Sequence, residues 1–62
     1  MTTMDEWIEQ RVKMIAYGFS VEQIQRDCWN FCHREYIGIL TLEAMIYKSM
    51  QLYAEVIKRS GI

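Results

Sequence analysis

The sequence predicts an all-α fold, either a three-helix bundle or a helical hairpin with a long, kinked second half. No proline occurs in the 62 residues, and 52% of them are hydrophobic against 24% charged, which is too apolar for a disordered chain. Three stretches of helical periodicity are each preceded by a hydroxyl residue, namely Thr3, Ser20 and Thr41. Each stretch is followed by a glycine, namely Gly18, Gly38 and Gly61. A chain of 7.5 kDa supports one core, so we expect a single domain over residues 1–62.

The first helix is expected over residues 4–17. Thr3 and Glu6 have the spacing of a capping box, in which each side chain satisfies a free backbone N–H group at a helix start. Gly18 follows as a left-handed stop. Helical spacing gathers the apolar side chains of this segment on one stripe, formed by Met4, Ile8, Val12, Ile15 and Ala16 and widened by Trp7 and Met14.

The second helix is expected over residues 21–37, ending near Gly38. Ser20 and Gln23 form a second capping box. The apolar stripe of this helix consists of Val21, Ile24, Cys28, Phe31, Cys32, Tyr36 and Ile39. Glu35 falls inside this stripe and Arg11 lies among the apolar residues of the first helix. We therefore expect an Arg11–Glu35 ion pair, within one chain or across a dimer, that sets the helix register.

The third helix is expected to begin at the cap Thr41 and to end before Gly61, with Lys58 and Arg59 in its last turn. As an alternative, Gly38 bends one long helix over residues 20–59. The apolar residues of this segment cover about 220° of the helix, whereas a core-facing helix needs about 100°. They are Leu42, Met45, Ile46, Tyr47, Met50, Leu52, Tyr53, Ala54, Val56 and Ile57.

This excess of apolar surface predicts an interface, because a chain of this size has little material to cover it. We expect a homodimer, a docking surface for a larger protein, or both. The residues expected at the interface are Trp7, Met14, Met45, Tyr47, Met50, Leu52, Tyr53, Val56 and Ile57. This pattern favours a small non-enzymatic regulator, adaptor or inhibitor, of the size of bacterial and phage accessory proteins.

Metal and catalytic chemistry has few candidates in the sequence. Cys28 and Cys32 are four residues apart, and His33 points about 100° away from them on a helix. A structural zinc site needs four ligands, and the C-x-x-C redox spacing is absent. We expect both cysteines to be core residues, and we expect no metal, cofactor or enzymatic activity.

Nucleic-acid binding is the alternative function. Residues 16–24 resemble the opening of helix-turn-helix regulators, where one helix ends at a glycine and the next begins at a serine, here Gly18 and Ser20. The resemblance implies a dimeric regulator with a recognition helix after a further turn, whereas residues 27–33 continue with helical periodicity. The outer face of the second helix carries basic and aromatic side chains suited to phosphates and bases, namely Arg26, Trp29, Asn30, His33 and Arg34.

The expected compartment is the cytoplasm. The N-terminal residues lack the basic and apolar segments of a signal peptide. The longest apolar runs, residues 14–17 and 44–47, are far shorter than the about 20 residues of a membrane span. Two cysteines are also fewer than a small secreted domain usually carries. We expect no membrane partner.

Overall fold

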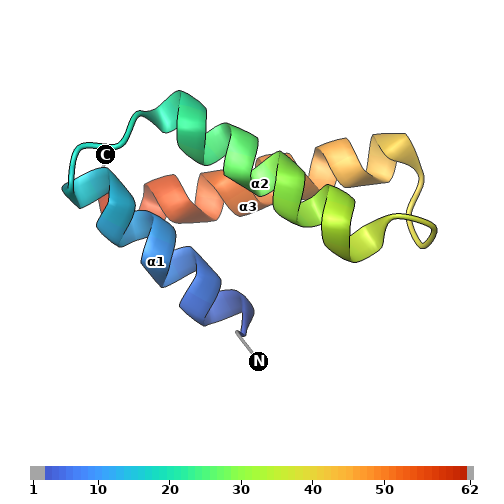
Figure 1. Cartoon of the computed structure of the whole chain (residues 1–62), viewed down its shortest axis with the longest axis horizontal. Helices are drawn as coiled ribbons and strands as arrows, with labels where there is room; N and C mark the ends of the chain where they lie inside the picture. Colours follow the sequence, from blue (N-terminus) through green and yellow to red (C-terminus); the bar gives the residue numbers. More distant parts are fainter. Residues whose placement is uncertain (1–2, 62) are drawn as a thin grey trace.

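The computed structural model describes residues 3–61, and residues 1–2 and 62 of the expected domain lie outside this described part. Figure 1 shows three helices: α1 (Met4–Ala16), α2 (Val21–Tyr36) and α3 (Leu42–Ser60). The prediction of an all-α fold of three packed helices is confirmed. None of these three helices is both long and apolar enough to cross a membrane.

Each helix begins at the hydroxyl residue that the sequence marks as its cap. The Thr3 hydroxyl accepts a hydrogen bond from the Glu6 backbone N–H at 3.1 Å. Ser20 and Thr41 do the same for α2 and α3, each over 3.2 Å. Such a cap satisfies a backbone donor that has no partner inside the helix and contributes about 1 kcal/mol.

The chain reverses direction between α2 and α3, so the alternative of one long helix over residues 20–59 is wrong. Ile37 leaves the helix with an extended backbone, and Gly38 follows at φ 80°, a left-handed conformation that favours glycine. The backbone N–H groups of Ile39 and Leu40 both donate to the Tyr36 carbonyl at 2.9 Å. As a result α3 runs back along α2 as an antiparallel hairpin, visible on the right of Figure 1.

Helix α3 is the central element of the fold. It packs closely against both α1 and α2, whereas the backbones of α1 and α2 approach each other at few positions. Figure 1 shows α1 and α2 diverging like the arms of a V across α3. The Cα atoms span 34 × 24 × 16 Å. The shortest of these dimensions is the thickness of two layers of helices. Within residues 3–61, this arrangement covers one side of α3 and leaves its opposite side without a neighbour.

The core lies where the helices cross. Its buried side chains come from all three helices and are Trp7, Ile8, Ile24, Cys28, Cys32, Leu52 and Val56. The rings of Trp7 and Phe31, 4.7 Å apart between centroids, join α1 to α2. The ends of the predicted stripes are exposed instead, at Met4, Ala16, Val21, Ile39, Leu42 and Ile46, because crossing helices make contact over only part of their length.

A cluster of charges ties the start of α1 to the end of α3. The Arg59 guanidinium lies 2.9 Å from an Asp5 oxygen, 3.1 Å from a Glu9 oxygen and 2.9 Å from a Glu55 oxygen. Asp5 and Glu9 are exposed, and Arg59 and Glu55 are about one third exposed, so salt screens their attraction and each pair contributes little alone.

Candidate protein-binding surfaces

Four of the predicted interface residues are part of the core of a single chain. Trp7, Met45, Leu52 and Val56 are buried, with exposed fractions of 6%, 6%, 7% and 0%, so none is available on the surface of one chain for a partner. Their assignment to an interface is thereby corrected. The physical reason is that α3 needs Met45, Leu52 and Val56 to meet the two helices that lie on one side of it.

The remaining predicted interface residues are at least partly accessible. Tyr47 and Met50 are 65% and 64% exposed, while Met14, Tyr53 and Ile57 are half-buried. Met50 and Tyr53 also line a shallow groove of about 390 Å³ beside α2. We define the outer α3 face as the accessible residues on the side of α3 away from Leu52 and Val56, namely Tyr47, Met50, Ala54 and Ile57.

A second apolar surface lies where the α2–α3 hairpin turns. Ile37, Ile39 and Leu42 are 60%, 73% and 60% exposed there, and Ile46 is 45% exposed one turn into α3. We call these four residues the hairpin end. They were missed at the sequence level because Ile39 was assigned to the buried stripe of α2. The sequence feature that could have revealed this surface is the aliphatic composition of the loop around Gly38, because loops are usually polar.

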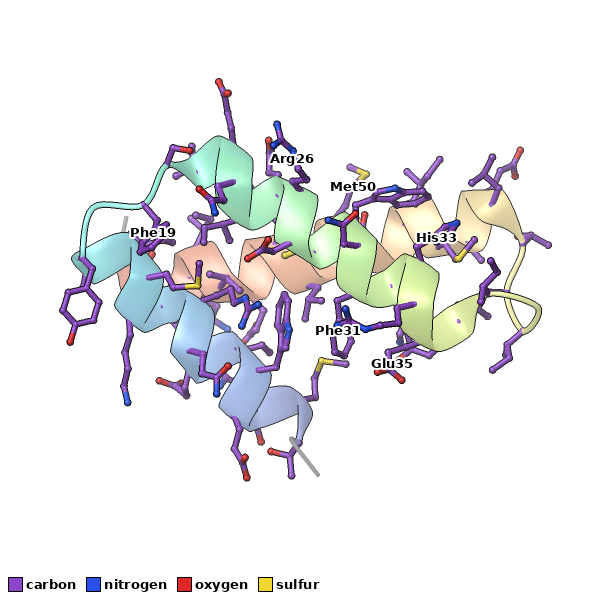
Figure 2. All side chains as sticks on the ribbon, in the orientation of Figure 1. Phe19, Arg26, Phe31, His33, Glu35 and Met50 are labelled. Atoms are coloured by element: carbon purple, nitrogen blue, oxygen red, sulfur yellow. The ribbon has the colours of Figure 1, made fainter. Side chains whose placement is uncertain are left out.

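The basic and aromatic residues predicted as a nucleic-acid face are only partly brought together. Arg26 and His33 extend from the same side of α2, opposite to Phe31 and Glu35 (Figure 2). The Trp29 and His33 rings lie 5.7 Å apart between centroids. Arg34 departs from this group, because its guanidinium carbon lies 6.0 Å from the centre of the Phe31 ring.

The predicted Arg11–Glu35 ion pair does not form within one chain, where Arg11 pairs with Asp27 instead. Arg11 Nε lies 3.3 Å from Asp27 Oδ2, and its guanidinium carbon is 4.3 Å from the centre of the Trp7 ring. Arg11 Nε is buried without an aligned hydrogen bond, so the contact with Asp27 is an electrostatic one. Glu35 is exposed and makes no ion pair within residues 3–61.

Both cysteines are free thiols in the core, as predicted. Burial raises the pKa of the Cys28 thiol to about 12 and shifts the pKa of the Cys32 thiol in the same direction. At pH 8 such a shift leaves Cys28 with about a thousandfold less thiolate than an ordinary cysteine. Within residues 3–61 no three His, Cys, Asp or Glu side chains gather as metal ligands would.

Comparison with protein-family models, with curated proteins and with solved structures finds no match to this chain. What the chain binds is therefore argued from its own surfaces. The outer α3 face and the hairpin end each gather several exposed apolar side chains, and contiguous exposed apolar surface marks interaction sites.

The raised cysteine pKa values predict a loss of stability in alkaline solution. Cys28 has an ordinary pKa of 9.0 in the unfolded chain and about 12 in the folded one, so the unfolded state releases the thiol proton first. We expect this contribution to be complete below pH 9 and to be lost progressively as the pH rises toward 12. Urea denaturation at pH 8, 9.5 and 11 measures it. In Cys28→Ala the fall with pH should be smaller, and an unchanged slope would contradict the assignment.

Proposed function

We propose that this chain is a small non-enzymatic protein-binding module, a regulator, adaptor or inhibitor, that docks its hairpin end on a larger protein. The observation that carries the proposal is the exposure of Ile37, Ile39 and Leu42 within one six-residue segment, at a single turn of the fold. Since both thiols are free, we place the interaction in the reducing cytoplasm.

The chemistry of the hairpin end suits an apolar groove on the partner. All four of its side chains are aliphatic, so burying them releases water from apolar surface without leaving polar groups unpaired. Each well-buried side chain of this size contributes about 1.5–3 kcal/mol when fully removed from water. This is enough for four residues to anchor a small interface.

The loop that presents these side chains is already ordered in the free chain. Ile39 and Leu40 donate their backbone N–H groups to Tyr36, and Thr41 caps α3 directly afterwards. A preformed loop loses little conformational entropy on binding, which favours affinity.

The test replaces one residue of the hairpin end by a charge. We expect immobilised Ile39→Asp protein to retain at least tenfold less of the specific partner from a lysate of the native host than the unchanged chain does. Gln10→Asp, at an exposed position of α1, is the matched control and should retain it fully. Circular dichroism confirms that both variants fold. Equal retention by the two variants, or no specific partner for the unchanged chain, contradicts the proposal.

Nucleic-acid binding through α2 is the second candidate, supported by the contact of Trp29 with His33. In addition Asp27, whose charge would oppose a phosphate, is paired with Arg11. Fluorescence anisotropy with a labelled DNA duplex distinguishes the two functions. An affinity that falls steeply between 50 and 200 mM salt, with a shallower slope in Arg26→Ala/Arg34→Ala, would favour this candidate over protein docking.

A further inference from the structure

We propose that the outer α3 face binds a second copy of this chain, with the two α3 helices antiparallel. This interface goes beyond the proposed function, because it uses a different surface from the hairpin end. Three observations on α3 carry the proposal: the spacing of its exposed apolar residues, the small residue among them, and the charges at their two ends.

The spacing of the outer α3 face is that of a helix–helix seam. Tyr47, Met50, Ala54 and Ile57 follow one another at intervals of three, four and three residues, the spacing with which two helices pack side by side. Ala54 is small enough for the backbones to approach closely, and Met50 is flexible enough to fill the space beside it. The face runs over residues 47–57, about one and a half heptads, so it suits another helix of similar length.

The charges at the ends of this face select the second copy. Glu43 lies one turn before Tyr47, and Lys58 lies one turn after Ala54, both exposed and on the same side of α3. Within residues 3–61 neither makes an ion pair in the single chain. Each copy therefore offers one acidic and one basic end to its neighbour.

An antiparallel pair with its two-fold axis between positions 50 and 51 brings Glu43 of each copy to Lys58 of the other. A parallel pair would place Glu43 against Glu43 and Lys58 against Lys58, which is repulsive. Such self-complementarity is what a two-fold symmetric interface requires. It is not required of a face that binds an unrelated protein, and this is why the second copy is the occupant that we infer.

The proposed pairing leaves the hairpin ends free. Each hairpin end adjoins the start of its own α3, so an antiparallel arrangement places the two ends at opposite extremes of the dimer. The dimer and the docking of a larger partner are thus compatible, and either can fail experimentally without the other.

The test measures self-association by sedimentation equilibrium over a range of concentrations. We expect the unchanged chain to reach a mass near 15 kDa, twice the 7.5 kDa of one chain. Glu43→Lys and Lys58→Glu should each weaken the dimer about tenfold, since both pairs become repulsive, and the double variant Glu43→Lys/Lys58→Glu should restore it. Glu35→Lys, an exposed charge change on α2, is the control that should leave the dimer unchanged.

Cysteine cross-linking tests the orientation, because the native thiols are buried and have raised pKa values. A mixture of Glu43→Cys and Lys58→Cys proteins should form a disulfide-linked heterodimer under mild oxidation, and neither variant should link to itself efficiently. Self-linking of Glu43→Cys, or a monomeric mass at every concentration, overturns the proposal. A monomer that still loses its partner through Ile39→Asp would leave the proposed function standing.

Discussion

Replacing Ile24 by alanine is expected to remove about 2–5 kcal/mol from the free energy of unfolding. Ile24 is 0% exposed and belongs to the core cluster that joins the three helices, so the substitution leaves a cavity that the packed helices cannot fill. A chain of 62 residues has a total stability of about 3–9 kcal/mol. Urea denaturation followed by circular dichroism should therefore show a variant that is largely unfolded or close to it.

The matched control deletes the same atoms from the surface. Ile39 is 73% exposed in the native chain. The substitution Ile39→Ala should therefore change the free energy of unfolding by less than about 0.5 kcal/mol. Similar losses in the two variants would mean that Ile24 is not a core residue. A small loss for Ile39→Ala would also mean that Ile39 has no structural role and is free to serve as a docking residue.

Replacing Asp27 by asparagine is expected to cost about 1–2 kcal/mol of folding free energy, between the values for exposed and buried ion pairs. The Arg11 and Asp27 side chains are 19% and 25% exposed and lie 3.3 Å apart. Without Asp27, the Arg11 charge stays half-buried beside the Trp7 ring with no opposite charge to balance it.

Two further variants identify the partner of Arg11. Glu35→Gln should leave the free energy of unfolding unchanged within error, since Glu35 is exposed and pairs with nothing within residues 3–61. Arg11→Met keeps an apolar stem over Trp7 and removes the charge. If the pair is real, Asp27→Asn should have little effect in the Arg11→Met background. An undiminished effect there would show that Asp27 acts by another route.

Features that depend on neighbouring residues were predicted well from the sequence. A cap requires only a hydroxyl side chain and the backbone three residues later, which is why the starts of the helices at Thr3, Ser20 and Thr41 are confirmed. The turn at Gly38 was predicted as one of two alternatives. The extended backbone at Ile37 decides between them.

Features that depend on how the helices cross were not predictable from one helix at a time. Periodicity placed Glu35 and Arg11 on apolar stripes, but only the crossing of α1 over α2 puts Asp27 next to Arg11. In the same way, the wide apolar arc of α3 did not reveal which part of it is core. Tyr47 and Met50 became surface residues because both neighbouring helices lie on one side of α3.

The position of α1 in the fold makes stability unequal along the chain. Because α1 packs mainly on α3 and meets α2 through Trp7–Phe31 and Arg11–Asp27, it can detach by giving up these contacts while the α2–α3 hairpin keeps its own. Such partial opening costs less free energy than unfolding the whole chain. The ion pairs of Arg59 with Asp5 and Glu9 hold this helix at its first turns, so α1 is a unit whose release responds to ionic strength.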